Sequence, residues 1–441
     1  MPLIPEATLG RLLGSIEANN LVILCGAGLS IPAPSGLLSA VGVARLCYDR
    51  YQPIKELPVA MRDDISALAG HFCDSGELQS VFLRKLVPWN ELVGYPNSGH
   101  HATGDFLACR AVCAVLSTNV DGLIEQWANG QKVFLRGAIE AGEVADLADR
   151  TAPLLKIHGC MVRAPYTTLW AVQQLDEPAV QERLTEWSNW IHLNLQGRDL
   201  LIVGFWSDWA YLNEAISRVM TGHALASVTV IDPLPDAELE RRAPGLWTTV
   251  RGATTFAHVA GPSDMALEEI RVAFSRTWFK KFLRSGRPMI DASRGGCGAA
   301  ALEPPDGTAS DLYNMRKDAE GVPYHRAAQS REPAPAGAQA AYAQLLFLKA
   351  GASRSGAWFE CGGKIVRIVN GGGELLSGVQ ARYVEPPAVG QSDVVVCAGA
   401  MDLGVPGPLI ATGRGASTVR PGPGGTARWI TLEAAMTEFG L

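Results

Sequence analysis

The chain has 441 residues, 47% of them apolar and 19% charged. This length predicts two or three domains, and the composition excludes a wholly disordered or collagen-like chain. The net charge of −6 does not favour nucleic-acid binding by the protein as a whole. Half of all Gly and Pro residues lie in 286–441, so the chain combines two different compositions.

The first part of the chain alternates between helical periodicity and short apolar runs. The apolar runs are typical of strands buried on both faces of a parallel sheet. We predict helices over 6–18, 37–92, 103–109 and 121–128, and strands over 21–25, 114–117 and 133–135.

The same alternation continues to about residue 285. We predict strands over 153–157, 200–203 and 228–231, and helices over 178–195 and 264–283. Strands that alternate with helices indicate an α/β fold with a doubly wound parallel sheet. We therefore assign residues 1–285 to one domain of this class.

The Gly- and Pro-rich part has weaker signals. Residues 286–338 are rich in Gly, Pro and Ala and are expected to form a linker with little structure. Residues 339–441 are expected to form a small β-rich region. In it we predict a helix over 341–349 and β-like runs over 358–361, 365–369, 379–384 and 394–397.

Nine cysteines are present, and no two have the Cys-x-x-Cys spacing. A structural zinc site with four ligands is therefore not expected. The sequence has no secretory signal at its start and no apolar stretch long enough to cross a membrane. We expect a cytoplasmic protein with reduced thiols.

Polar residues follow three of the predicted strands. Gly26-Ala27-Gly28 and Ser30 follow the first strand, Asn119 and Asp121 follow the second, and His158 follows the strand over 153–157. In an open α/β sheet, ligands bind beyond the carboxyl ends of the strands. Taken singly, each group also has a structural explanation, as a tight turn, a helix cap or a packed histidine.

Together these segments resemble the sirtuin superfamily. The resemblance extends over about residues 15–280 and is carried by the segments Gly26–Ser30, Pro96–His100, Thr118–Asp121, Lys156–Gly159, Gly204 and Ile231–Pro233. It implies an NAD-binding catalytic domain.

The chain also departs from sirtuin deacetylases. Their zinc module has two paired-cysteine clusters, whereas this chain has only Cys160 in the corresponding region. The segment Ser30–Gly36 replaces their Ile-Pro-Asp-Phe-Arg stretch, Thr118 replaces a Gln, and Gly204–Asp208 replaces a Gly-Thr-Ser turn. These departures resemble a bacterial, zinc-less branch that hydrolyses NAD as an antiphage effector, with a helical insertion that corresponds here to residues 37–95.

The resemblance implies roles for individual residues. Asn119 would hold the ribose hydroxyls and the attacking water, and Asp121 would hold the carboxamide. His158 would act as a base, for which its ordinary pKa near 6.5 is suitable. The remaining residues expected to bind NAD are Gly26, Ala27, Gly28, Ser30, Thr118, Gly204, Asp208 and Asp232. Trp206 and Trp209 flank a strand end and are candidates for a wall of the site.

Two other functions fit the same residues. A protein deacylase or ADP-ribosyltransferase would use a peptide nucleophile in place of water, and a binding module would hold NAD without turnover. The implied NADase would act through a homo-oligomer or a sensor partner protein. The nearly balanced charge of 339–441 does not favour direct nucleic-acid binding by that region.

Overall fold

The computed structural model divides the chain into two compact units, Met1–Ile270 and Arg271–Leu441. Each is described by itself below. The residues that the structure describes are 2–131, 133, 135, 137–147, 152–220, 227–288, 303, 306–320, 336–383, 392–402 and 427–441.

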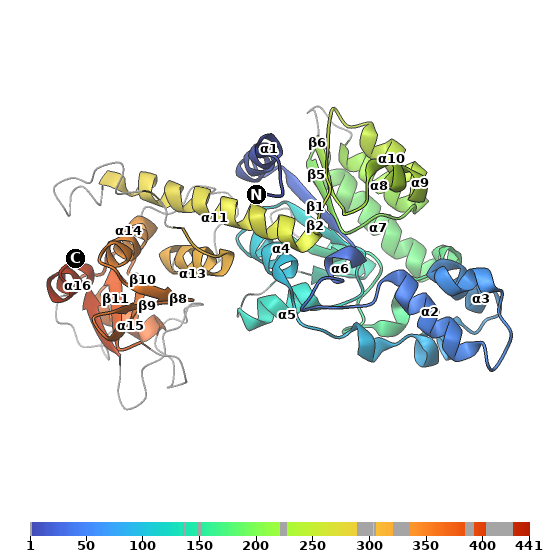
Figure 1. Ribbon diagram of the computed structural model, residues 1–441, viewed down its shortest axis with the longest axis horizontal. Coiled ribbons are helices and arrows are strands. Elements are labelled where there is room, and N and C mark those ends of the chain that lie inside the picture. The colour runs from blue at the N-terminus through green and yellow to red at the C-terminus, as the bar shows by residue number, and fades with distance from the viewer. Residues whose placement is uncertain are drawn as a thin grey trace. The chain divides into compact units, whose positions relative to one another are not determined.

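The first unit is built on a parallel sheet of seven strands in the order β3-β4-β2-β1-β5-β6-β7 (Figure 1). The strands are β1 (Leu21–Cys25), β2 (Ala114–Ser117), β3 (Gly137–Ala138), β4 (Leu154–Lys156), β5 (Asp199–Val203), β6 (Ser227–Ile231) and β7 (Thr255–Val259). Strand β1 pairs with β2 on one side and β5 on the other. The strand order reverses at β1, which makes its carboxyl end the expected place for a ligand.

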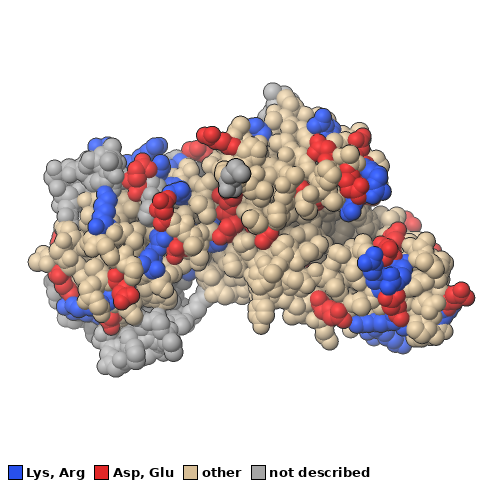
Figure 2. All heavy atoms as spheres, viewed as in Figure 1, with Lys and Arg blue, Asp and Glu red and all other residues tan. Residues whose placement is uncertain are grey.

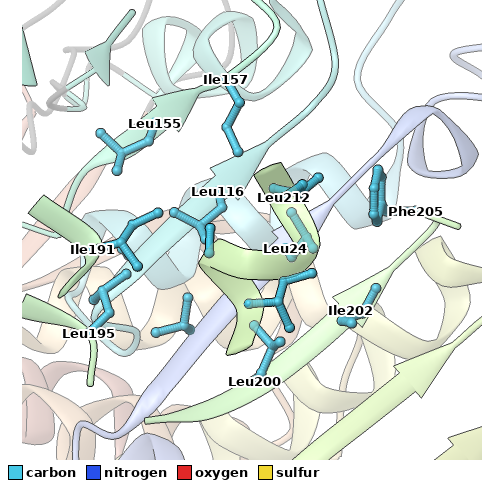
Figure 3. Packing of buried hydrophobic residues seen from close by; sticks show 14 of the residues in the cluster. Leu24, Leu116, Leu155, Ile157, Ile191, Leu195, Leu200, Ile202, Phe205 and Leu212 are labelled. Atoms are coloured by element: carbon cyan, nitrogen blue, oxygen red, sulfur yellow. The ribbon is translucent and has the colours of Figure 1, made fainter. Parts of the chain in front are cut away.

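Helices flank the sheet on both of its faces (Figure 1). They are α1 (Glu6–Glu17), α4 (Ser98–Ala108), α5 (Leu123–Gly130), α6 (Ala141–Ala145), α7 (Pro178–Asn194), α8 (Ala210–Met220), α9 (Asp236–Arg242), α10 (Pro244–Arg251) and the start of α11 (Ser263–Ser285). Figure 3 shows how Leu24, Leu116 and Ile202 of the strands pack with Ile191 of α7 and Leu212 of α8. This apolar core fixes α7 and α8 against the sheet.

A helical lobe is inserted between β1 and α4. It contains α2 (Ala40–Tyr51), η2 (Val59–Asp63), α3 (Ile65–Asp74), η4 (Trp89–Leu92) and η3 (Leu78–Leu86), which is wound as a π-helix. The lobe has its own core, in which Phe72 stacks on Phe82. Figure 2 shows Lys and Arg side chains interleaved with Asp and Glu over its surface. Arg45 and Asp63 form one of the ion pairs of this lobe.

The second unit contains a mixed sheet of five strands in the order β12-β11-β10-β9-β8. The strands are β8 (Ser353–Ser355), β9 (Trp358–Cys361), β10 (Lys364–Asn370), β11 (Val394–Ala398) and β12 (Arg428–Thr431). Strands β10, β11 and β12 are parallel, and β8 and β9 complete the sheet as antiparallel strands. The helices are α13 (Ala309–Glu320), α14 (Ala336–Lys349), α15 (Leu376–Tyr383) and α16 (Leu432–Phe439).

The predicted fold class is confirmed, because the first unit is a parallel α/β sheet and a separate small mixed sheet follows it. Three local expectations are wrong. Residues 379–383 belong to helix α15, in which Val379 packs in the core; Val384 lies outside the described residues. Val133 and Leu135 lie outside any strand, and the edge strand is β3 instead; Phe134 lies outside the described residues.

The third wrong expectation concerns the predicted linker. Part of it, 309–320, forms α13, whose buried Met315 and Ala319 pack with the core of the second unit. The predicted division after residue 285 also differs from the compact units, which divide within α11. Phe279 and Phe282 of that helix are buried in the core of the second unit.

Candidate active site

A cavity of about 520 Å³ opens at the carboxyl edge of the parallel sheet. The turns that follow β1, β2, β4 and β5 form its floor, and the helical lobe forms part of its wall. The predicted site residues that line it are Ala27, Ser30, Thr118, Asn119, Asp121, His158, Gly204 and Asp208, together with Trp206 and Trp209. Gly26, Gly28 and Asp232 do not line it. The structure thus brings eight of the eleven predicted residues to one cavity.

The glycines at the carboxyl ends of β1 and β5 have a packing role. The Gly28 N–H donates to the Gly204 carbonyl at 2.8 Å. A Cβ added at Gly28 would lie 2.7 Å from Gly204 Cα, and Gly204 itself has φ of +59°. The two turns can cross this closely only because Gly28 and Gly204 have no side chain. The Gly28 N–H, which the sequence analysis expected to bind NAD, is therefore already bonded within the protein.

Ser30 is the centre of a buried hydrogen-bond network. Its hydroxyl donates to Asp121 Oδ2 at 2.8 Å and accepts from Asn119 Nδ2 at 3.1 Å. Its oxygen also lies 3.1 Å from His100 Nε2. Ser30 is 2% exposed. Ser30 was expected to bind NAD itself, whereas here its hydroxyl orients the two side chains that follow β2.

His100 completes this network, and its protonation follows from its partners. Its Nδ1 accepts a hydrogen bond from the Asn97 backbone N–H at 3.2 Å, within the capping box that begins α4. The proton of a neutral ring therefore lies on Nε2, which donates to the Ser30 oxygen. Burial lowers the pKa of His100 to about 4, so the ring is neutral at pH 7. Sequence reasoning noticed the segment Pro96–His100 but did not place His100 in the site.

Asn119 carries an acceptor that the protein leaves unused. Its amide nitrogen is bonded to Ser30, but its Oδ1 is buried and has no hydrogen-bond partner among the described residues. The residue is 7% exposed and lines the cavity. A buried polar atom without a partner costs free energy of about 1–3 kcal/mol, which a ligand that donates a hydrogen bond would offset.

Asp121 is held from several sides. Its Oδ1 accepts from the Leu123 N–H at 3.1 Å, at the start of α5, while its Oδ2 faces Ser30. Lys156, at the end of β4, donates from Nζ to the Asp121 backbone carbonyl and forms an ion pair with Glu125 at 3.1 Å. Burial by itself lowers the pKa of Lys156, but Glu125, Cys160 and Asp121 outweigh it and raise that pKa. Lys156 is thus a buried cation beside the site, a role that its position inside an apolar run did not suggest.

His158 follows β4 and lines the cavity with 8% of its surface exposed. Its Nε2 lies 2.6 Å from Tyr211 Oη, and its ring packs edge-on against Trp209 at 5.1 Å between centroids. Burial, with a smaller contribution from the Arg183 cation, lowers the pKa of His158 to about 3. The expectation of an ordinary pKa near 6.5 is therefore wrong, because the ring lies in a largely water-free environment.

The helical lobe contributes one wall of the cavity, which the sequence did not predict. Leu38 and Val41 lie on this wall together with Asp63 and Asp64. Asp64 also caps α3, since its Oδ1 accepts from the N–H groups of the first turn at 2.9 Å. The lobe therefore presents both apolar and carboxylate groups to the cavity.

Two predicted binding residues are engaged elsewhere. Asp208 reaches the cavity, but its carboxylate accepts from the N–H groups of Gly245 at 2.9 Å and Leu246 at 3.0 Å, at the start of α10. Asp232 lies outside the cavity, and its Oδ1 accepts from the Leu234 N–H at 2.9 Å in a local turn. Burial raises the pKa of Asp232. The Asp232 carboxylate thus stabilises a local turn in this Asp-Pro segment.

Among the described residues, no group of three or more His, Cys, Asp or Glu side chains is placed to hold a metal ion. Within the same residues, no helix has the length and hydropathy needed to span a membrane.

Solved structures of Sir2 proteins are similar to this chain. One, titled for the mechanism and regulation of Sir2 enzymes, is 13% identical and aligns over 60% of this chain and 96% of its own, with a TM-score of 0.35. A Sir2 homologue in complex with NAD is also 13% identical, over 60% and 94% of the two chains, with a TM-score of 0.33. A mutant Sir2 homologue bound to ADP-ribose is 15% identical, over 62% and 98%, with a TM-score of 0.35. No known protein family and no curated protein matches the sequence.

Proposed function

We propose that the cavity binds NAD+ and hydrolyses it to nicotinamide and ADP-ribose. The observation that carries the proposal is the unpartnered Asn119 Oδ1, buried in the same cavity as His158 at the switch point of the parallel sheet. Its acceptor oxygen and the imidazole are suited to the hydroxyl groups of a ribose. The sequence resemblance to zinc-less NAD-hydrolysing sirtuin relatives supports the same substrate.

The reaction breaks the bond between the ribose C1 and the nicotinamide nitrogen. Nicotinamide leaves as a neutral molecule because its ring is cationic in NAD+, so no acid has to protonate it. The ribose carbon becomes oxocarbenium-like, water adds to it, and one proton is released. The protein must therefore hold the ribose, separate it from nicotinamide and admit one water.

The ordered network around Ser30 supplies this positioning. Asn119 cannot turn freely, because Ser30 holds its amide nitrogen, and its Oδ1 is thereby presented to a ribose hydroxyl or to the attacking water. We assign Asp121, which the same serine fixes, to the nicotinamide carboxamide. Fixed groups of this kind lower the barrier because they do not have to reorganise during the reaction.

We assign His158 to a ribose hydroxyl as a neutral hydrogen-bond acceptor. With a pKa of about 3, the ring is uncharged at neutral pH, so one of its nitrogens is always available to accept a hydrogen bond. It is a weaker base than an ordinary histidine, so its main contribution is orientation and polarisation of the hydroxyl. The tryptophans beside it, Trp206 and Trp209, form an apolar surface suited to the nicotinamide ring.

We further propose that this activity serves antiphage defence in the cytoplasm and is held silent until a trigger acts. A homo-oligomer or a sensor partner protein would transmit the trigger, and the unit Arg271–Leu441 is the candidate to receive it. The support is the sequence resemblance and the separate fold of that unit. Infection of cells that express the protein, with cellular NAD+ followed over time, tests this role.

The direct test incubates the purified full chain with NAD+ and follows nicotinamide, ADP-ribose and cyclic ADP-ribose by chromatography. Asn119→Ala and His158→Ala should abolish nicotinamide release and leave folding intact, while Asn194→Ala, which removes an amide from the end of α7, should not change it. Release that requires an added acyl-peptide would instead support a deacylase or transferase. Tight binding of ADP-ribose to a chain that releases nothing, even with peptide or in an extract of phage-infected cells, would support a binding module.

A further inference from the structure

Tyr211 lies directly against the histidine of the cavity. It is in the first turn of α8, and its hydroxyl is 2.6 Å from His158 Nε2. Trp209 packs on both rings, at 5.1 Å from His158 and 5.9 Å from Tyr211 between centroids. The ring of His158 therefore packs in an edge-to-face arrangement with an indole and forms a hydrogen bond with a phenol at one nitrogen.

A buried cation, Arg183, acts electrostatically on this pair. Arg183 of α7 is 2% exposed; its Nη1 donates to the Thr167 carbonyl at 3.3 Å and is 3.9 Å from Glu140. Its Nε and Nη2 are buried without a hydrogen-bond partner among the described residues. A guanidinium that is so little compensated exerts a strong local field, because no water screens it.

Burial keeps both rings uncharged, whereas the Arg183 cation acts with burial on His158 and against it on Tyr211. Burial and Arg183 together disfavour the imidazolium form of His158, and burial raises the pKa of Tyr211 despite the opposing effect of Arg183. The carboxylates that face the same cavity are Asp63, Asp64, Asp121 and Asp208, and Glu140 lies behind Arg183. The pair is consequently a neutral phenol bonded to a neutral imidazole.

We infer that Tyr211 is a positioning residue for His158, an inference that rests on the proposed function. Tyr211 accepts a hydrogen bond from Nε2–H of His158. Nδ1 is then the ring nitrogen whose lone pair can accept a hydrogen bond from a substrate hydroxyl. Burial, with a smaller contribution from Arg183, keeps the ring uncharged, so that this lone pair is not lost to a solvent proton. The hydrogen bond of one ring nitrogen sets the protonation of the other.

Nuclear magnetic resonance of the full chain labelled with ¹⁵N-histidine tests this without any turnover. His158→Gln identifies the resonances of His158. In the expected spectrum the Nε2 proton exchanges slowly with solvent, and Nδ1 has the ¹⁵N chemical shift of an unprotonated ring nitrogen. In Tyr211→Phe the Nε2 proton should exchange rapidly, while Tyr48→Phe, which removes another buried hydroxyl bond at 2.9 Å, should leave it unchanged. A proton on Nδ1 in the wild type, or slow exchange retained in Tyr211→Phe, overturns the role of Tyr211.

The same spectra test Arg183 by titration. Arg183→Met should raise the pH at which His158 takes up a proton, and Arg183→Lys, which keeps the charge, should restore the wild-type behaviour. Equal titration of the Met and Lys variants would overturn the role of the cation.

Kinetics then link positioning to the reaction. If NAD+ is the substrate, Tyr211→Phe should lower kcat about tenfold with KM for NAD+ unchanged, as expected for the loss of one hydrogen bond that orients a reacting group. A wild type that does not cleave NAD+, even in an extract of phage-infected cells, but has the expected spectra would refute the proposed function and leave the positioning of His158 intact. An unchanged kcat in Tyr211→Phe would show that the positioning has no catalytic consequence and would overturn the inference.

Discussion

The buried His100 should make the first unit sensitive to mild acid, and the size of the effect follows from its pKa. An unfolded chain protonates histidine near pH 6.5, whereas burial holds His100 at about 4. Between these values the unfolded state binds more protons than the folded state, so stability is full above pH 6.5 and falls as the pH approaches 4. The loss is about 1.4 kcal/mol per pH unit in that window, or about 2 kcal/mol between pH 7 and pH 5.

The perturbation that isolates this group is His100→Gln, since the Gln amide can still donate to Ser30 but does not titrate. Urea unfolding at pH 7 and pH 5, followed by tryptophan fluorescence, gives the stability change on acidification for each protein. The wild type should lose about 2 kcal/mol more than His100→Gln. His192→Gln, which removes an exposed imidazole of α7, should behave as the wild type. Equal losses in the wild type and His100→Gln would refute the assignment of a neutral, buried His100.

Three further predictions follow from the site. Gly28→Ala should destabilise the first unit by about 1–3 kcal/mol, since its Cβ would lie 2.7 Å from Gly204 Cα. Gly10→Ala, in open space on α1, should stabilise the unit by about 0.5–1 kcal/mol. Thermal unfolding measures both changes, and equal effects would contradict the close crossing of the turns at Gly28 and Gly204. Nicotinamide release should change by less than about twofold between pH 7 and pH 5 on account of His158, whereas an ordinary histidine would cost about 30-fold; a steep acid limb would show that the ring titrates normally. Ser30→Ala should lower kcat without unfolding the protein, because Asn119 and Asp121 lose their shared partner; a normal rate with intact circular dichroism would contradict this.

The parallel sheet was largely predictable from the sequence because its strands are buried on both faces. The runs at 21–25 and 114–117 coincide with β1 and β2 as the structure has them. Strand β7 was not predicted, since it is only partly buried and its sequence Thr-Phe-Ala-His-Val lacks a continuous apolar run. The helix at 376–383 was mistaken for a strand because β-branched and aromatic residues also occur on short helices whose packing decides their conformation.

The candidate site was predictable where chain order alone brings residues together. Because parallel strands end at one edge, Asn119, Asp121 and His158 had to lie near one another. The contributions of Tyr211 and of the helical lobe depend on how α8 and α3 pack, and no local pattern in the sequence reveals that. Asp208 illustrates the opposite error, since its position was right and its partner, the start of α10, was not visible in the sequence.

The two buried histidines show why residue type and position are insufficient to assign chemistry. His100 and His158 both lie in segments that carry the sequence resemblance. Both are buried, and both have lowered pKa values. Their difference lies in the second ring nitrogen. In His100 both nitrogens are bonded within the protein, to Asn97 and Ser30, so the ring can only support the network. In His158 the bond to Tyr211 occupies Nε2, and we infer that Nδ1 is left for a ligand in the cavity. We therefore assign a role in the chemistry to His158 and a structural role to His100.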